Sequence, residues 1–202
     1  MGKRFKQYLN EMTMMAETEP TLSEHFPHII DLVSRLGKKL GDFNGLEFFN
    51  LNYNDSSFLV TKQGGEWIGY VNYNEITILG TKYYQLLIVY IQPQFRNKAH
   101  LSKMIWFLKN QFNKPVIDYG VVSKKGLETY LAMNKSGKFD MRWLNTKNGE
   151  TDEMTNLEGK TSLSGPTDWR IIIESDSSPI NMVKGTGGIM GGRYSFFEDV
   201  GP

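Results

Sequence analysis

Cysteine is absent from the 202 residues of this chain, and histidine occurs only three times. Without cysteine the chain has no disulfide framework, no thiolate metal ligand and no cysteine nucleophile, which fits a reducing compartment. The histidines, at positions 25, 28 and 100, are too few and too scattered to predict a metal centre. We therefore expect chemistry that needs neither a metal nor a thiol.

Long hydrophobic runs are also absent. The longest apolar stretches, such as residues 86–91, are far shorter than the roughly 20 residues of a membrane-spanning helix, and no apolar leader opens the chain. With 40% hydrophobic and 22% charged residues, the composition is that of a globular chain with one sizeable core. We expect a cytoplasmic protein without a membrane partner, or one carried inside a particle.

Acidic residues are scarce in the middle of the chain. Residues 96–149 hold 11 Lys and Arg but only 3 Asp and Glu, whereas both flanking parts are net acidic. This pattern indicates either an anionic ligand or a solvated face with its counter-charges supplied by the flanks. Aromatic residues among these basic residues suggest nucleic-acid binding as a further hypothesis. The chain has no recognised nucleic-acid motif, so we do not expect a nucleic-acid partner.

The first half of the chain predicts two helices and then an antiparallel meander. Apolar residues at helical spacing predict an amphipathic helix over 1–15 and a second that begins between Ser23 and Pro27 and ends near Gly37. Runs rich in aromatic and β-branched residues then predict strands at 46–52, 57–61, 66–73 and 83–92. Their short connections, including a glycine pair at 64–65, favour hairpins.

The second half predicts a crossover. Helical spacing within 93–112 is followed by a strand at 116–122, a helix at 124–133 and a strand at 141–145, so the strands on either side of the first helix should lie parallel or splayed. A loop over 146–167 and a strand at 169–174 complete the pattern. The expected fold is α/β (α+β), with a mixed, mostly antiparallel central sheet flanked by helices.

The last residues differ in composition from the rest. Glycine occupies five of the eight positions from 185 to 192, which cannot hold a packed element unaided. The aromatic group at 194–197 predicts docking, either on this domain or on a protein partner or neighbouring subunit. We therefore expect one domain over 1–174 and a glycine-rich tail or arm over 175–202.

The turn between the strand at 83–92 and the following helix is the most informative stretch. A strand that leads into a helix N-terminus creates an anion site, and Arg96 and Lys98 add full positive charges to it. An ordinary strand-to-helix turn with basic residues facing water is the alternative.

The stretch Pro93-Gln94-Phe95-Arg96-Asn97-Lys98-Ala99-His100-Leu101 resembles the Pro-x-Tyr-Arg-Gly-x-Gly-x-Gly loop of the GCN5-related N-acetyltransferase (GNAT) superfamily. Members typically have two N-terminal helices, antiparallel strands and this loop, which binds the pyrophosphate of acetyl-coenzyme A. The resemblance covers roughly residues 1–145. Asn97, Ala99 and Leu101 replace the family's glycines, so we expect the branched Leu101 side chain to crowd the phosphate oxygens.

The resemblance implies transfer of an acetyl group from acetyl-coenzyme A to an amine acceptor, without a covalent enzyme intermediate. By position, Tyr130 would protonate the departing thiolate, and Glu75 would act as the base, directly or through a water. Backbone groups near Val89 and Ile91 would pair with the pantetheine arm. The pyrophosphate would be held by the loop residues Arg96, Asn97, Lys98, Ala99, His100 and Leu101.

A second hypothesis is a non-catalytic protein on the same fold. The altered loop, the glycine-rich tail and the many Asn and Tyr residues are similar in character to the acetyltransferase-like proteins among the virion components of short-tailed bacteriophages. On this interpretation, residues 175–202 are an assembly arm that orders only against neighbouring subunits. The protein would then be found in a virion or in the host cytoplasm.

Overall fold

The computed structural model describes residues 19–53, 56–96, 98–120, 124–161 and 167–174. The predicted helix over 1–15 and the tail over 175–202 lie outside these residues, so the domain boundary at 174 stays a prediction. No helix in the described ranges is long and apolar enough to cross a membrane. The helices are α2 (Glu19–Leu36), α3 (His100–Phe112) and α4 (Lys124–Lys135), with a short 3₁₀ turn at Pro93–Phe95.

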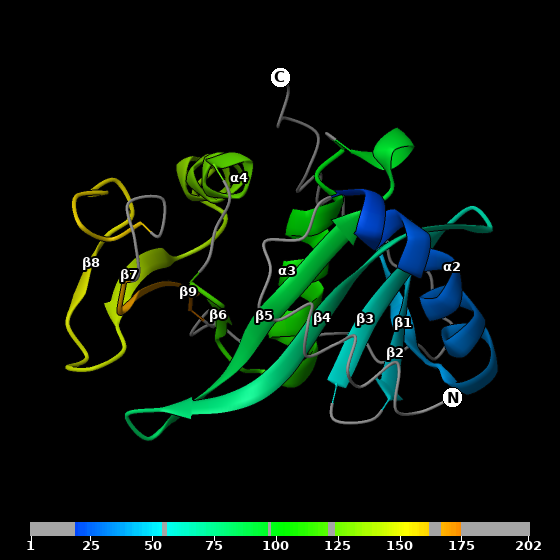
Figure 1. Ribbon diagram of the computed structural model, residues 1–202, viewed down its shortest axis with the longest axis horizontal. Helices are drawn as coiled ribbons and strands as arrows, with labels where there is room; N and C mark the ends of the chain where they lie inside the picture. Colours follow the sequence, from blue (N-terminus) through cyan, green and yellow to red (C-terminus); the bar gives the residue numbers. More distant parts are fainter. Residues whose placement is uncertain (1–18, 54–55, 97, 121–123, 162–166, 175–202) are drawn as a thin grey trace, which may run out of the picture.

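Nine strands form one mixed sheet in the order β1-β2-β3-β4-β5-β6-β9-β7-β8. Every neighbouring pair is antiparallel except β5 and β6, which run parallel on either side of the α3 crossover. The predicted fold class is confirmed: the sheet is mostly antiparallel and helices flank it (Figure 1). The strands are β1 (Lys38–Phe43), β2 (Leu46–Tyr53), β3 (Ser56–Gln63), β4 (Glu66–Ile78), β5 (Thr81–Ile91), β6 (Val116–Asp118), β7 (Met141–Asn145), β8 (Thr151–Glu153) and β9 (Trp169–Ile173).

Hairpins build the first half of the sheet, as predicted. Gly64 and Gly65 connect β3 to β4 with φ values of +55° and +92°, a left-handed geometry that glycine adopts at low cost. β4 and β5 run further than expected, to 13 and 11 residues. Their long hairpin reaches past the other strands toward the β6–β8 side of the sheet (Figure 1).

Four boundaries differ from the sequence prediction. β1 was not predicted, because Lys38–Phe43 is polar and contains Gly41; it forms as an edge strand on β2. β8 interrupts the expected loop over 146–167, because residues 151–153 pair with β7. Helix α2 already includes Glu19 and continues through Pro27, since its apolar side is held against the sheet. β6 ends at Asp118 instead of 122, just before Gly120 with φ +92°.

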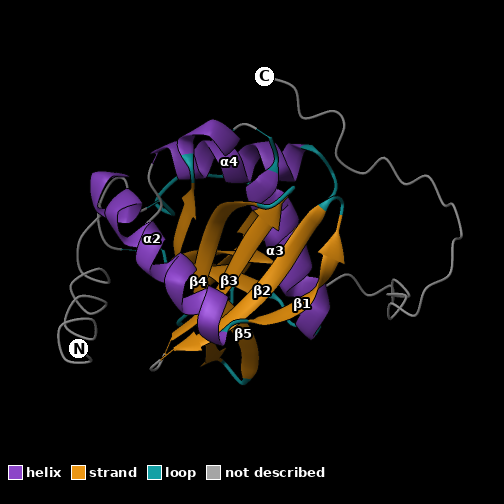
Figure 2. Cartoon of the chain, turned by 90° about the vertical axis from the view of Figure 1, so that its right-hand side faces the viewer, coloured by secondary structure: helices purple, strands orange, loops and turns teal. Residues whose placement is uncertain are grey.

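The two faces of the sheet carry separate cores. Helix α2 packs on one face, where Phe26 lies against Tyr70 and Tyr90 with ring centroids 6.3 Å and 5.2 Å apart. Helices α3 and α4 cover the other face, and Phe107 of α3 stacks on Phe48 at 3.9 Å. Figure 2 shows α2 and α3 on opposite sides of the strands. The sheet is therefore buried on both faces along its centre, which fixes the positions of the residues at its strand ends.

Candidate functional site

Strand β5 loses its neighbour partway along its length. Its parallel pairing with β6 covers residues 84–86 against 116–118, yet β5 continues to Ile91. At the same level, the β4 register places Asn72 opposite Ile88 and Tyr73 opposite Leu86, so Leu87 is the extra residue of a β-bulge. Within the described ranges, β5 beyond Leu86 has no strand on its β6 side. An extended ligand chain can pair with such an edge.

Val89 and Ile91, the two residues predicted to lie along such a ligand, are on this part of β5. Both are half-buried and pack against the core beneath α3 and α4. Their backbone groups lie beyond the last β5–β6 pair, and their role in holding the pantetheine arm stays a prediction. The structure therefore places them at the opening between the two strands.

The loop after β5 folds back on the end of that strand. The Arg96 Nε donates a hydrogen bond to the Ile91 carbonyl at 3.0 Å, and the Arg96 backbone N–H donates to Pro93 at 3.3 Å. Ala99, with φ +53°, is the left-handed residue that precedes α3 and gives no side-chain cap. The first backbone N–H groups of α3 therefore face the loop. The capping residue provides no side-chain acceptor for them. Asn97 lies outside the described residues.

Positive charge gathers at this helix N-terminus. Lys98 is exposed, with its ammonium 5.6 Å from the centre of the Phe95 ring, and Lys103 lies in the first turns of α3, where burial lowers its pKa. The first turn contains no acidic residue. The partial positive charge of the helix N-terminus adds to the charges of Arg96, Lys98 and Lys103. The arrangement favours an anion at this end of α3.

His100 is the first residue of α3 and is only 4% exposed, but among the residues that the structure describes neither of its ring nitrogens has a hydrogen-bond partner. Burial, together with the charges of Lys103 and Lys98, lowers its pKa to about 4. The ring is therefore neutral at physiological pH and keeps one N–H to donate. A phosphate oxygen would satisfy this buried donor, so the loop fits an anionic group.

Leu101 is the second residue of α3. Its side chain is half-buried and packs against the core beneath α3 and α4. The expectation that its branched side chain crowds the phosphate oxygens stays a prediction.

Tyr130 lies on α4 and is buried, and Asp118 ends β6 at the last β5–β6 pair. Burial raises the pKa of the Tyr130 phenol well above its usual range, and the charge of Asp118 adds to this effect. Burial also raises the pKa of Asp118 to about 7, although its carboxylate accepts hydrogen bonds from the backbone N–H groups of Ile171, at 2.9 Å, and Gly120. The second oxygen, Oδ2, is buried and has no hydrogen-bond partner in the described part of the chain. A carboxyl group with this pKa is suited to accept and release protons near neutrality.

Neither neighbouring cation neutralises Asp118 by a direct bond. Arg170 donates to the carbonyls of Thr167, at 2.6 Å, and Trp169, at 2.9 Å. Its guanidinium lies against Gly120, so close that a Cβ on that glycine would be 2.2 Å from the Arg170 Cζ. Lys160 is paired with Asp152 at 2.8 Å. Within the described ranges, the hydrogen bonds to the Asp118 carboxyl come from backbone N–H groups, and burial is the largest influence on its pKa.

A small cavity of about 10 Å³ adjoins Asp118, with room for about one water molecule. Its walls are Gly120 of the chain after β6, Leu127 of α4, Trp143 of β7, Trp169 of β9, and Lys160 and Thr161 of the β8–β9 connection. Leu127 lies one helical turn before Tyr130, so the cavity, Asp118 and Tyr130 are neighbours. A water here could hydrogen-bond the unpaired Oδ2.

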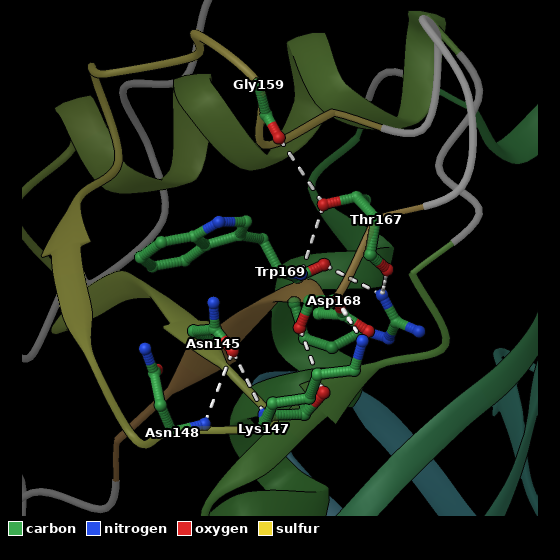
Figure 3. Close-up of polar contacts among 9 residues, drawn as sticks. Asn145, Lys147, Asn148, Gly159, Thr167, Asp168 and Trp169 are labelled. Carbon is green, nitrogen blue, oxygen red and sulfur yellow. Dashed lines mark hydrogen bonds and ion pairs between the residues drawn. The ribbon is translucent and has the colours of Figure 1, made fainter.

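The residues around β9 are held in place by short polar contacts (Figure 3). Thr167 accepts a hydrogen bond from the Trp169 N–H at 3.1 Å and donates its own to the Gly159 carbonyl at 3.4 Å. Lys147 on the β7–β8 turn forms an ion pair with Asp168 at 2.9 Å. These contacts fix Trp169, and with it one wall of the cavity.

Glu75 lies elsewhere, on the exposed part of β4. Lys114 and Lys82 both bind its carboxylate, Lys82 at 3.1 Å, and these bonds lower the pKa of Glu75. A base needs a pKa raised toward neutrality, so this environment is the opposite of the one required. The sequence reasoning did not single out Asp118, although a carboxylate that ends the apolar run Val116-Ile117 is a detectable signal.

No protein-family model matches this chain, and no curated protein matches it. Among solved structures, it is similar to a GNAT family acetyltransferase from Elizabethkingia anophelis with acetyl-CoA bound, with 13% identity, 65% of this chain and 97% of that chain covered, and a TM-score of 0.35. It is also similar to Arabidopsis thaliana Naa50 in complex with a bisubstrate analogue, with 10% identity, 74% and 91% coverage, and a TM-score of 0.37.

The first of these solved structures is described as a GNAT family acetyltransferase, the superfamily that the loop sequence resembles. At TM-scores of 0.35 and 0.37, the similarity carries no information about the chemistry or the substrate of this chain. Both have to be argued from its own residues.

Proposed function

We propose that this protein transfers an acetyl group from acetyl-coenzyme A to an amine. The observation that carries the proposal is the end of the β5–β6 pairing at Leu86 and Asp118, while β5 continues to Ile91. A basic loop lies at the C-terminal end of β5, beside this opening, and the buried carboxyl of Asp118 and phenol of Tyr130 lie where the β5–β6 pairing ends. A long ligand with a phosphate end and an amide-bearing arm suits this arrangement.

The loop and β5 would hold the coenzyme. The backbone N–H groups at the start of α3, the His100 ring N–H and the charges of Arg96 and Lys98 would bind its pyrophosphate, and the β5 edge near Val89 and Ile91 would pair with its amide arm. Asn97, Ala99 and Leu101 complete the loop, Leu101 through its contact with the core. When bound, the coenzyme supplies an acetyl group activated as a thioester.

Asp118 and Tyr130 would handle the protons. The acceptor amine must lose a proton as it forms its new bond, and the unpaired Oδ2 of Asp118, alone or through one water in the adjoining cavity, would accept it. Tyr130 keeps its proton at neutral pH because burial raises its pKa, so it would donate to the departing sulfur. Asp118 is preferred to Glu75 as the base, since the ion pairs of Glu75 lower its pKa.

Calorimetric titration of acetyl-coenzyme A into the full-length protein tests the proposal. We expect micromolar binding that weakens as salt increases, because phosphate contacts with cations are screened. Replacing both Arg96 and Lys98 by Ala should weaken binding at least tenfold, since two phosphate-binding charges are removed. Lys38→Ala is the matched control, because it removes an exposed positive charge from the edge strand β1, at the other end of the sheet order from the β5–β6 opening.

Equal binding by the Arg96/Lys98 variant and the wild type would contradict the loop assignment. Absence of binding at both salt concentrations would reject the transfer function. That result would favour the non-catalytic interpretation, and the next experiment would be to identify the protein that binds residues 175–202.

A further inference from the structure

The backbone donors that hold Asp118 come from two segments that are distant in the chain. The Ile171 N–H of β9 donates to the carboxylate at 2.9 Å, and the Gly120 N–H, just beyond the end of β6, donates to it as well. Gly120 has φ +92°, in the left-handed region that glycine adopts at low cost. Because glycine has the widest choice of backbone conformations, contacts with neighbouring side chains decide where its N–H points.

Arg170, the residue before Ile171, covers Gly120. A Cβ built on Gly120 would lie 2.2 Å from the Arg170 Cζ and 2.3 Å from both its Nε and its Nη1. Only a hydrogen atom fits in this space, so the guanidinium packs directly on the Gly120 backbone. The same segment of β9 therefore supplies one backbone donor to Asp118 and covers the glycine that supplies the other.

Two carbonyl groups fix the guanidinium in this place. The Arg170 Nη1 donates to the Thr167 carbonyl at 2.6 Å and to the Trp169 carbonyl at 2.9 Å, so a single nitrogen makes both hydrogen bonds. Both acceptors are uncharged. These bonds therefore orient the guanidinium without neutralising its positive charge.

The charge of Arg170 opposes the effect of burial on Asp118. Burial raises the pKa of the carboxyl group, whereas the Ile171 N–H, the Arg170 charge and the Gly120 N–H all lower it. A positive charge held close to a buried carboxylate favours its ionised form. Three of the influences on Asp118 therefore depend on how the Arg170 segment sits against Gly120.

Two other ionisable side chains face Asp118 from the described elements packed around it. Tyr130 of α4 stays neutral at physiological pH, because burial raises its pKa. Lys160 lines the same cavity, but the carboxylate of Asp152, 2.8 Å from its Nζ, balances its charge. Arg170 is therefore the cation best placed to favour ionisation of Asp118.

We infer that Arg170 is a positioning residue for Asp118: its guanidinium holds the Gly120 backbone against the carboxyl group and supplies the positive charge that lets Asp118 ionise inside the fold. The inference rests on the proposed function where it gives Asp118 a proton to accept, but the contacts themselves can be tested without a substrate. It also explains why position 120 is a glycine, since any side chain there would displace the guanidinium.

Titration of the Asp118 carboxyl carbon, followed by nuclear magnetic resonance in the full chain, tests the inference directly. The wild type should titrate at about pH 7. Arg170→Gln keeps an N–H donor but removes the charge, so its midpoint should be higher by about one pH unit. Arg170→Lys should restore most of this shift, because one ammonium can donate to both carbonyls as Nη1 does. If Arg170→Gln does not fold, Arg170→Met takes its place.

Arg142→Gln is the matched control. Arg142 lies on β7, is 41% exposed and forms an ion pair with Asp140 at 3.1 Å. The substitution removes an arginine charge from the same half of the sheet, and the Asp118 midpoint should not move. An unmoved midpoint in Arg170→Gln, or equal shifts in the two variants, would overturn the inference.

Gly120→Ala tests the contact from the other side. The added Cβ and the guanidinium cannot occupy the same space, so this variant should raise the Asp118 midpoint as Arg170→Gln does. The two substitutions together should shift the midpoint no further than either one alone, because they remove the same interaction. Additive shifts would overturn the role given to this contact. The φ of Gly120 strains any other residue, so if Gly120→Ala does not fold, the Arg170 variants decide the question.

The pH profile of acetyl transfer distinguishes positioning from a merely structural role. With acetyl-coenzyme A and n-butylamine, kcat of Arg170→Gln should be about fivefold below that of the wild type at pH 7 and should equal it at pH 9, since Asp118 is then ionised in both. A uniform loss at every pH would indicate a structural role and overturn the inference. No acetyl transfer by the wild type would count against the proposed function, whereas the carboxyl titration would still decide the inference.

Discussion

The two halves of the sheet are assembled in different ways. Strands β1 to β5 have 6, 8, 8, 13 and 11 residues, and each pairs with the next strand along the chain. Strands β6 to β9 have only 3, 5, 3 and 5 residues, and their order, β6-β9-β7-β8, joins segments far apart in sequence. Short hairpins close small loops at low entropic cost, whereas the second half must close long ones.

The buried polar groups follow the same division. In the first half the buried polar side chains on strands, Thr61 and Asn72, are uncharged, whereas the second half buries the ionisable Asp118 and Lys160. The meander strands also bury the phenols of Tyr73 and Tyr83, whereas Asp118 ends β6 and Lys160 lies in the β8–β9 connection. The candidate site lies where the two halves meet, at the last β5–β6 pair. We predict that the longer, fully paired strands of the meander contribute more to stability than the short strands.

The strongest test of the comparison removes a scaffold side chain. Phe48 is fully buried and stacks on Phe107, so Phe48→Ala should lower the free energy of unfolding by about 4 kcal/mol. Phe139, buried beside β7, is the matched position in the second half, and Phe139→Ala should cost less, about 3 kcal/mol. Urea unfolding of the full chain, followed by circular dichroism, measures both. Equal losses would contradict the idea that the meander carries most of the stability.

A comparable effect concerns the pH dependence of stability in the second half. The pKa of Asp118 is raised from 3.8 to about 7 in the fold, so the folded state holds a proton that the unfolded state has released. Stability should therefore fall as pH rises from about 4 to about 7, by up to about 4 kcal/mol, and then level off. Asp118→Asn should lack this fall, because the amide does not titrate. The urea unfolding midpoints of the wild type and of Asp118→Asn are compared at pH 5 and pH 8. An equal change of midpoint in the two proteins would show that a group other than Asp118 causes the pH dependence.

The next test concerns the catalytic role of the residues at this boundary. Asp118→Asn should lower kcat by about a hundredfold to a thousandfold and remove the rise of the rate near pH 7, which reflects loss of the Asp118 proton. Tyr130→Phe should lower kcat by about a hundredfold while coenzyme binding is kept. Stopped-time assays from pH 5.5 to 9 provide the profiles. An unchanged profile in Asp118→Asn would remove that residue from the proton path.

The smallest effect is expected at Glu75, on the exposed part of the scaffold. Its carboxylate is held by Lys114 and Lys82 near the surface, and the Glu75 pKa lies below its usual range. Glu75→Gln should leave kcat and its pH profile unchanged, because surface ion pairs contribute little. A large loss of kcat with a normal fold would instead restore the sequence-based assignment of Glu75 as the base.

The candidate site could be predicted from sequence only in part. The loop at Arg96 and Lys98 follows a strand and precedes a helix, a local pattern that the sequence displays directly. Asp118 was missed because its significance depends on burial by α4 and β9, which lie far from it in the chain. Glu75 looked suitable from its place near the end of a strand, but its lysine partners come from β5 and from the chain after α3. Long-range packing sets a carboxyl pKa, and local pattern does not reveal it.

The amino-acid sequence by itself determined the antiparallel meander, the α3 helix and the basic strand-to-helix loop, because turns, side-chain periodicity and charge act over a few neighbouring residues. Tertiary structure decided the rest. Only the folded chain ends the β5–β6 pairing at Leu86, turns Leu101 into the core, and places Asp118 near Tyr130. Each of these results depends on contacts between segments distant in sequence, whose free energy exists only once the sheet and both helices are packed.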